Sequence, residues 1–153
     1  MTDGTMQTIV LVEDNEDDVA LLQRAFQRAA IANPLHVVGD GEAAMQYLAG
    51  EGGYVDRTQH PLPALLLLDL RLPRYSGFEV LAWLRTQPGL RRLVTVILTS
   101  SPQTADIARA YDLGANSYLV KPGTPSDLVA MVRTLHLYWI AYNTIPPLSP
   151  GTG

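Results

Sequence analysis

The chain has 153 residues, and none of them is cysteine. This absence excludes a disulfide framework, thiol catalysis and a cysteine-based zinc site, and it is consistent with a reducing compartment. Long apolar runs are missing too, since runs such as 64–68 are far shorter than the roughly 20 residues that a membrane helix needs. The opening residues are polar and acidic, unlike a secretory signal peptide. The sequence therefore predicts a cytoplasmic protein without a membrane segment.

Positive charge is scarce as well. The chain has 11 Lys and Arg residues against 15 Asp and Glu residues, a net charge of −4. This balance argues against nucleic acid as a partner, because nucleic-acid readers usually carry a basic face. Lys121 is the only lysine, and after Arg133 the chain holds many aromatic and aliphatic side chains but no charged residue. Lys121 and the uncharged C-terminal stretch are therefore the two places where the composition is unusual.

Short apolar runs alternate with longer helical patterns along the rest of the chain. Buried strands are predicted over 9–12, 35–38, 64–68, 94–98 and 116–120, and a helix follows each of them. Four of the helices have start signals: Asp40, the capping box of Ser76 with Glu79, Ser101 before Pro102, and Thr124 before Pro125. The sequence therefore predicts an α/β fold with a doubly wound five-stranded parallel sheet and helices on both faces, because a closed barrel needs eight units.

Polar side chains stand at four of the five predicted strand ends. They are Glu13 and Asp14 after the first strand, Asp69 after the third, Thr99 after the fourth and Lys121 after the fifth. In open α/β sheets, ligands bind outside the carboxyl ends of the strands, and neighbouring strands lie about 4.8 Å apart. Taken singly, each residue has a structural explanation, such as a helix cap or the first solvated position of a loop. Together they predict one shared pocket.

The chemistry of such a pocket is specific. Three carboxylates held together repel one another and favour a hard divalent cation such as Mg²⁺, which prefers oxygen ligands. Mg²⁺ and Lys121 would bring the charge of the pocket close to zero, so that it could accept a phosphoryl group. A carboxylate can act as the nucleophile and form an aspartyl phosphate, whose oxygens are then neutralised by metal, ammonium and hydroxyl groups. Asp69, Lys121 and Thr99 match these roles.

Four segments, in this order and spacing, resemble the receiver domain of two-component response regulators. They are Val12–Asn15, Leu68–Gly77, Leu98–Ser101 and Tyr118–Pro122, and the resemblance extends over about residues 8–137. It implies a flavodoxin-like receiver fold with strand order 2-1-3-4-5. We accordingly expect a disordered N-terminus over 1–7, a receiver domain over 8–140 and an uncharged C-terminal tail over 141–153.

The resemblance also implies how the protein works. Asp69 is expected to be the phosphoacceptor, which takes its phosphoryl group from a histidine of a sensor kinase, while Lys121 and Thr99 bind phosphoryl oxygens. Thr99 and Tyr118 are expected to form the conformational switch. The Lys121–Pro122 peptide bond is expected to be cis. The protein is then a phosphoacceptor that assists its own phosphorylation and dephosphorylation, and not an enzyme acting on a separate substrate.

The expected cofactor is Mg²⁺. The resemblance implies that Asp14 binds the ion directly, that Glu13 binds it through water, and that Asp69 and the backbone carbonyl of Arg71 complete the protein ligands. Arg71 stands two residues after the acceptor and has a long cationic side chain. We hypothesise that this side chain screens the acyl phosphate from water, so that Arg71→Ala would change the dephosphorylation rate.

Two segments, the long loop over 50–63 and the tail, point to a narrower group. Together with that loop, the tail sequence 138–147 resembles the small response regulators that partner bacterial phytochrome-type sensor kinases. This resemblance implies a stand-alone receiver that forms a homodimer through its last strand and helix, with Leu135, Tyr138, Trp139 and Tyr142 in the interface. The alternatives are that the loop is a tolerated surface insertion and that the tail folds back on its own domain.

Other functions fit the strand-end residues less well. A phosphohydrolase of the haloacid dehalogenase type also uses a strand-end aspartate, but it needs a second aspartate two residues later, where Arg71 stands. A flavodoxin-like or nucleotide-binding protein needs a glycine-rich phosphate loop after the first strand, where the acidic segment Glu13–Glu16 would repel phosphate. A degenerate receiver that serves only as a constitutive dimerisation module is opposed by the intact set of site residues.

Overall fold

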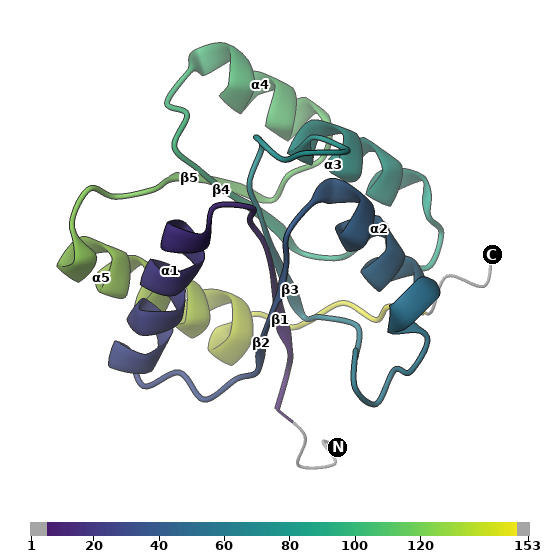
Figure 1. The fold of residues 1–153 in the computed structure, drawn as a ribbon, viewed down its shortest axis with the longest axis horizontal. Helices are drawn as coiled ribbons and strands as arrows, with labels where there is room; N and C mark the ends of the chain where they lie inside the picture. The colour runs from purple at the N-terminus through teal and green to yellow at the C-terminus, as the bar shows by residue number, and fades with distance from the viewer. Residues whose placement is uncertain (1–5, 150–153) are drawn as a thin grey trace.

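The computed structural model describes residues 6–149, and its centre is a parallel sheet of five strands (Figure 1). The strands are β1 (Ile9–Val12), β2 (Leu35–Val38), β3 (Leu65–Leu68), β4 (Thr95–Thr99) and β5 (Ser117–Val120). They lie in the order β2-β1-β3-β4-β5, and every neighbouring pair is parallel. The chain moves to one edge from β1 to β2 and to the other edge from β3 onward. The predicted doubly wound sheet and its 2-1-3-4-5 order are confirmed.

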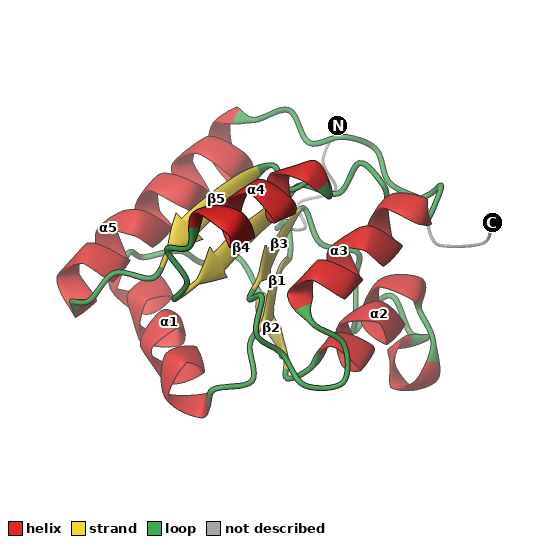
Figure 2. Ribbon diagram, turned by 90° about the horizontal axis from the view of Figure 1, so that it is seen from above, coloured by secondary structure: helices red, strands yellow, loops and turns green. Residues whose placement is uncertain are grey.

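Two layers of helices cover the sheet (Figure 2). Helices α1 (Glu16–Arg28) and α5 (Pro125–Leu135) pack together on one face. The other face is covered by α2 (Gly41–Ala49), α3 (Gly77–Thr86) and α4 (Thr104–Asp112). Among residues 6–149 no helix has both the length and the apolar character that a membrane span requires.

The three interior strands, β1, β3 and β4, are buried along their whole length, which explains why β1 and β3 are apolar at every position. Alternate residues pack into two separate clusters because successive side chains of a strand point to opposite faces. One cluster, under α2, α3 and α4, takes Val10, Val12, Leu66 and Leu68, and the other, under α1 and α5, takes Ile9, Leu11, Leu65 and Leu67. Glu13 and Asp69, which directly follow β1 and β3, are therefore held by strands that pack into the core on both faces.

Three of the four predicted helix starts are confirmed, and one is wrong. Asp40 and Thr124 cap α2 and α5, and Ser76 forms the expected capping box with Glu79 at α3. The helix expected to follow a cap at Ser101 begins at Thr104 instead, with Gln103 as N-cap. The Ser101 hydroxyl accepts from the Gln103 N–H at 3.2 Å and donates to the Asp106 carboxylate at 2.6 Å. It therefore organises the turn before the helix, which starts one turn away from it.

The long segment over 50–63 caps the end of α2. The Arg57 guanidinium donates to the carbonyls of Tyr47 at 2.7 Å, Leu48 at 2.8 Å and His60 at 3.1 Å. The Tyr47 hydroxyl, which is buried, donates to the carbonyl of Pro61 at 2.9 Å. The last carbonyls of a helix have no partner within the helix, so the loop supplies the donors that α2 lacks. The segment is therefore anchored to α2 by both side-chain and backbone groups.

Helix α5 continues without a break into a π-helix, η2 (His136–Tyr142). Trp139 and Ile140 pack partly buried against the cluster under α1 and α5. The following residues run back across the domain, and the Ser149 N–H donates to the carbonyl of Gly89 at 2.9 Å while Leu148 packs against the other cluster. For residues 143–149, the alternative that the tail folds back on its own domain is what the structure shows (Figure 1).

The N-terminal segment expected to be disordered, 1–7, falls largely outside the described residues, which begin at Met6. Within the described part, the carbonyl of Gln7 accepts a hydrogen bond from the Asn33 amide at 2.8 Å. Asn33 in turn lies 3.0 Å from the His136 ring at the start of η2. The start of the described chain and the end of α5 are therefore joined through one buried side chain.

Candidate functional site

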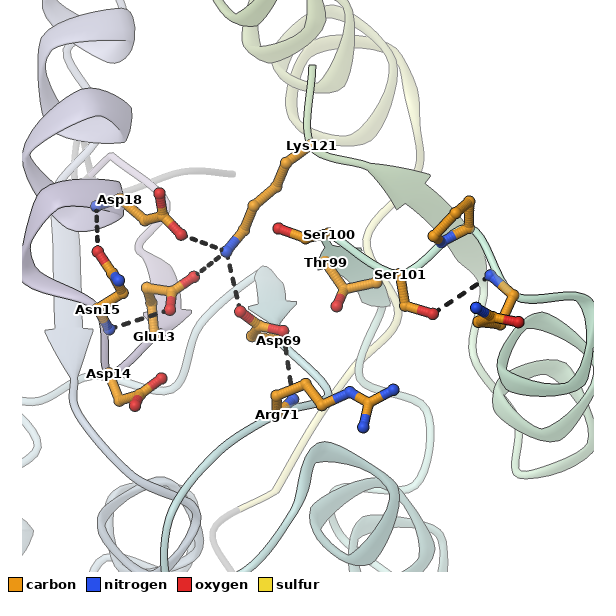
Figure 3. Close-up of a pocket in the computed structure, with 12 residues that line it drawn as sticks. Glu13, Asp14, Asn15, Asp18, Asp69, Arg71, Thr99, Ser100, Ser101 and Lys121 are labelled. Carbon is orange, nitrogen blue, oxygen red and sulfur yellow. Dashed lines mark hydrogen bonds and ion pairs between the residues drawn. The ribbon is translucent and has the colours of Figure 1, made fainter. Parts of the chain in front are cut away.

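The carboxyl ends of β1, β3, β4 and β5 open into one cavity of about 490 Å³ (Figure 3). Its lining includes every polar residue expected at a strand end: Glu13, Asp14, Asp69, Thr99 and Lys121. Arg71 and Ser101 line it as well, and so does Asp18, from the first turn of α1. The cavity lies beside the point where the strand order reverses, which is where ligands bind in open α/β sheets.

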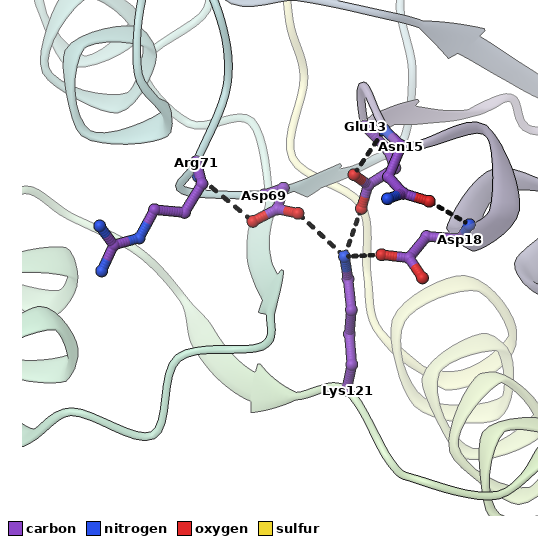
Figure 4. A network of polar contacts seen from close by, with 6 residues as sticks. All are labelled: Glu13, Asn15, Asp18, Asp69, Arg71 and Lys121. Atoms are coloured by element: carbon purple, nitrogen blue, oxygen red, sulfur yellow. Dashed lines mark hydrogen bonds and ion pairs between the residues drawn. The ribbon is translucent and has the colours of Figure 1, made fainter.

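The Lys121 ammonium lies at the centre of the charged groups (Figure 4). Its Nζ is 2.9 Å from Oδ2 of Asp69, 2.8 Å from Oδ2 of Asp18, and in direct contact with Oε1 of Glu13. The side chains of Asp69 and Glu13 are almost fully buried, and that of Lys121 is 13% exposed. Three carboxylates from three different segments are therefore held together by a single cation.

Burial and charge pull the pKa values of these groups in different directions. Burial raises the pKa of Glu13 to about 7, and the neighbouring Asp69 adds to this while Lys121 opposes it. Burial also disfavours the charged form of Asp69, but its interactions with the neighbouring Glu13 and with the Lys121 ammonium outweigh it and hold the pKa of Asp69 below its usual value. Burial likewise disfavours the charged form of Lys121, but its carboxylate partners raise its pKa. Asp69 and Lys121 are therefore ionised at neutral pH.

Backbone geometry fixes the second oxygen of Asp69. The backbone N–H of Arg71 donates to Oδ1 of Asp69 at 3.3 Å. The N-terminus of α3 approaches this strand end so closely that a Cβ on Gly77 would lie 2.2 Å from the carbonyl oxygen of Asp69. Only glycine fits there, because real Cβ atoms do not approach an oxygen so closely. Thr99, at the end of β4, is 1% exposed and lines the same cavity.

Tyr118 and Arg71 connect the cavity to α4. The Tyr118 hydroxyl donates to the carbonyl of Ser101 at 2.8 Å. The Arg71 guanidinium extends outward and pairs with Asp106 of α4 at 3.2 Å, and its side chain is 73% exposed. Asp106 also accepts from the Ser101 hydroxyl. Arg71 therefore reaches toward α4 in this structure, and its hypothesised role as a screen over the acyl phosphate stays a prediction.

The oxygen donors around the cavity have the chemistry of a magnesium site. In the part of the chain that the structure describes, no three acidic or histidine side chains are already arranged around one metal position, and the Lys121 ammonium instead bridges Glu13, Asp18 and Asp69. The carboxylates of Glu13, Asp14, Asp18 and Asp69 line the cavity and outnumber its cationic side chains, so a hard divalent cation would compensate the remaining negative charge. The donor types and their charge therefore fit Mg²⁺.

Two residues that contact the site, Asp18 and Asp106, are not predicted from the sequence, and one peptide bond has the other isomer. Asp18 was missed because an acidic residue in the first turn of a helix is explained equally well by the favourable charge at a helix N-terminus. Asp106 was missed because nothing in its local sequence indicates that it meets Arg71. The expected cis bond at Lys121–Pro122 is trans, the isomer that X–Pro bonds favour by about 0.5–1 kcal/mol.

The four residues expected in a dimer interface have different surroundings. Leu135 is buried in the core of its own domain. Trp139 and Tyr138 line an apolar groove of about 770 Å³ between β5 and α5, together with Leu119 and Met131. Tyr138 and Tyr142 are 55% and 75% exposed. The groove lies beside β5, which is an edge strand of the sheet.

Comparison with known proteins identifies the kind of domain. The family model described as response regulator receiver domain matches residues 9–133. The protein named "Probable methanogenesis regulatory protein FilR2", from Methanothrix harundinacea, is 40% identical over 139 residues, which are 90% of this chain and 86% of that protein. Response regulator Rcp1 from Synechocystis sp. is 38% identical over 140 residues, 92% of this chain and 93% of that protein.

Solved structures give the same answer. The phosphorylated cyanobacterial phytochrome response regulator RcpA superposes with a TM-score of 0.85 at 37% identity, and the match covers 93% of this chain and 99% of RcpA. The Mn²⁺-bound form of Rcp1 superposes with a TM-score of 0.81 at 38% identity, covering 92% and 99% of the two chains. Fold and sequence are therefore similar to these proteins over nearly the whole chain.

Proposed function

Since this chain belongs to the response regulator receiver domain family of two-component signalling, we propose that it accepts a phosphoryl group on Asp69 from a histidine of a sensor kinase. One observation carries the proposal. The Asp69 carboxylate is buried at the end of β3, faces an acidic cavity and contacts the single lysine of the chain. An ionised carboxylate beside a fixed ammonium is the arrangement that an aspartyl phosphate needs.

The residues that line the cavity have different roles in the proposed phosphoryl transfer. An oxygen of Asp69 attacks the phosphorus, so an O–P bond forms while the N–P bond to the donor histidine breaks and the histidine leaves with the bonding electrons. The lowered pKa of Asp69 keeps this oxygen unprotonated. The Lys121 ammonium and the Thr99 hydroxyl can each donate to oxygens of the arriving group, where negative charge is concentrated. Asp14, Asp69 and the carbonyl of Arg71, with Glu13 through water, would hold Mg²⁺, which when bound supplies further positive charge for the phosphoryl oxygens.

Phosphorylation in the cavity is expected to change the conformation of residues on β5 and in the turn before α4. Thr99 is expected to move toward the phosphoryl group, and the space it leaves allows the Tyr118 ring to turn inward. The bond from Tyr118 to the carbonyl of Ser101 would then break, which changes the surface formed by the turn before α4. We expect a separate protein to read this change.

Two alternatives are opposed by specific residues. A phosphohydrolase with an aspartate nucleophile would need an acid two residues after Asp69, but that side chain belongs to Arg71 and pairs with Asp106. A receiver that serves only for dimerisation would not need a buried ammonium held by three carboxylates. We therefore assign the protein the role of phosphoacceptor, as receivers of this family generally have.

The sensor kinase is proposed to be of the phytochrome type. RcpA is described as a phytochrome response regulator, and its match covers 93% of this chain and 99% of RcpA, which is more than the residues 9–133 that the receiver family model matches. FilR2 is described in other terms, as a regulator of methanogenesis. The assignment of a phytochrome-type kinase as partner therefore rests on the similarity to RcpA. Transfer of a phosphoryl group from a purified phytochrome kinase to this protein would test it.

The phosphoacceptor role is tested with a small phosphodonor. Purified protein incubated with Mg²⁺ and acetyl phosphate should gain the mass of one phosphoryl group, measured by intact mass spectrometry. Removal of Mg²⁺ with a chelator should prevent the gain, because the carboxylates of the cavity then repel the anionic donor. A protein that never gains this mass under these conditions would contradict the proposed function.

The groove between β5 and α5 is proposed to bind a second copy of the chain. Its lining is mainly apolar, with Asp127 as its one charged residue, and it lies beside an edge strand. The exposed rings of Tyr138 and Tyr142 belong to a stretch that has no charged residue after Arg133. Patches of this kind mark interfaces, and an edge strand leaves backbone groups free to pair. Leu135 would contribute only by shaping the groove from within.

Sedimentation measures this association. The wild-type protein should be a dimer at tens of micromolar, and a double substitution of Tyr138 and Tyr142 by glutamate should make it a monomer, because two charges would enter the apolar contact. Tyr111→Glu, an equally drastic change on an exposed ring of α4, should leave the dimer intact. A wild-type monomer would contradict the dimer and leave the phosphoacceptor role untouched.

A further inference from the structure

Asp18 lines the cavity but has no part in the phosphoryl transfer proposed above. Its Oδ2 lies 2.8 Å from Nζ of Lys121, and its side chain is 32% exposed. The backbone N–H of Asp18 donates to the side chain of Asn15, the N-cap of α1, at 3.0 Å. The carboxylate therefore reaches the ammonium from the fixed first turn of a helix, while Glu13 and Asp69 reach it from the loops after β1 and β3 (Figure 4).

The three contacts of Lys121 use all of its hydrogen-bonding capacity. An ammonium has three N–H donors, and here each of them has a carboxylate partner. Two of the partners change in the proposed reaction. Asp69 becomes phosphorylated, and Glu13 is expected to bind Mg²⁺ through water. Of the three, Asp18 alone keeps its carboxylate unchanged throughout.

We propose that Asp18 is a positioning residue that holds the Lys121 ammonium in the cavity both before and after Asp69 is phosphorylated. Lysine carries its charge on a flexible four-carbon stem, so a fixed anion on a helix restricts where that charge can lie. Asp18 does not touch the reacting atoms, and its effect passes through Lys121. The inference rests on the proposed function for the phosphorylated state, and on geometry alone for the unphosphorylated state.

The single lysine makes this inference directly measurable. Acetylation of Lys121 by an N-hydroxysuccinimide ester, read by mass spectrometry on the peptide that contains it, reports on one side-chain amine. In the absence of any phosphodonor, Asp18→Asn should raise the acetylation rate by about tenfold, the effect of losing one charged hydrogen bond. Asp18→Glu keeps the charge and should restore most of the protection.

Asp17→Asn is the matched control. It makes the same change of charge one residue earlier in the same helical turn, on an exposed side chain that does not line the cavity. The acetylation rate of Lys121 should be unchanged in this variant. Equal rates in the Asp18→Asn and Asp17→Asn proteins would overturn the proposal, because a general charge effect would then explain the result.

A second arm repeats the measurement after phosphorylation with phosphoramidate and Mg²⁺. Lys121 should stay protected in the wild-type protein and should react faster in Asp18→Asn, which also should take up phosphate more slowly. A phosphorylated Asp18→Asn protein whose Lys121 is as protected as in the wild type would overturn the claim for the phosphorylated state. A wild-type protein that gains no phosphoryl mass would instead refute the proposed function, while the first arm would still decide whether Asp18 holds the ammonium.

Discussion

Asp69→Asn is expected to abolish phosphoryl uptake altogether. The amide keeps the shape of the side chain but lacks the anionic oxygen that attacks phosphorus, so no acyl phosphate can form. Intact mass spectrometry after incubation with Mg²⁺ and acetyl phosphate should show no phosphorylated species in this variant. The fold should persist, because Lys121 retains Glu13 and Asp18 as partners.

Asp112→Asn provides the control for this substitution. Asp112 is the last residue of α4, is exposed and does not line the cavity. The variant should gain one phosphoryl group at the wild-type rate. If Asp69→Asn gained the same mass as Asp112→Asn, another side chain would be the acceptor and the assignment of Asp69 would be wrong.

Lys121→Met is expected to have the largest effect on stability. The substitution keeps the apolar stem but leaves the buried carboxylates of Glu13 and Asp69 without their cation. Removing one partner of a buried ion pair costs about 3–5 kcal/mol. Urea unfolding at neutral pH in magnesium-free buffer should show a loss of this size, and the rate of phosphoryl uptake should fall by roughly 100-fold, as when one electrostatic donor is removed from a site.

The effect of Mg²⁺ separates this explanation from simple loss of packing. Added Mg²⁺ should recover part of the lost free energy of unfolding, because it supplies positive charge to the same carboxylates. Arg28→Met removes an exposed cation from the last turn of α1 and should cost less than about 1 kcal/mol. A Lys121→Met protein as stable as Arg28→Met would contradict the view that this ammonium holds the cavity together.

Much of the fold can be predicted from local patterns in the sequence. The strands are short apolar runs, and the helix starts at Asp40, Ser76 and Thr124 follow from side chains that bond to nearby backbone N–H groups. The predicted start of α4 after Ser101 is wrong. The Ser101 hydroxyl also bonds to Asp106, and the residues next to Ser101 in the sequence do not indicate this contact. The π-helix over His136–Tyr142 was also missed, since apolar spacing does not distinguish it from an α-helix.

The cavity could be anticipated because parallel strands bring their carboxyl ends to one edge of the sheet. Applied to the predicted strands, that rule places Glu13, Asp69 and Lys121 in one pocket. It could not supply Asp18, which reaches the cavity from a helix, or the outward direction of the Arg71 guanidinium. Contacts between a helix and a strand end depend on how the helix packs, and the order of residues alone does not fix this.

The most direct test of the account is to locate the phosphoryl group in the phosphorylated protein. Borohydride converts the carbonyl of an acyl phosphate to an alcohol, so a phosphorylated aspartate becomes homoserine, which peptide sequencing by mass spectrometry identifies. We predict homoserine at position 69 and at no other acidic residue. Homoserine at Asp14 or Asp18, or a phosphorylated protein in which position 69 remains aspartate, would contradict the claim that the cavity serves the Asp69 carboxylate.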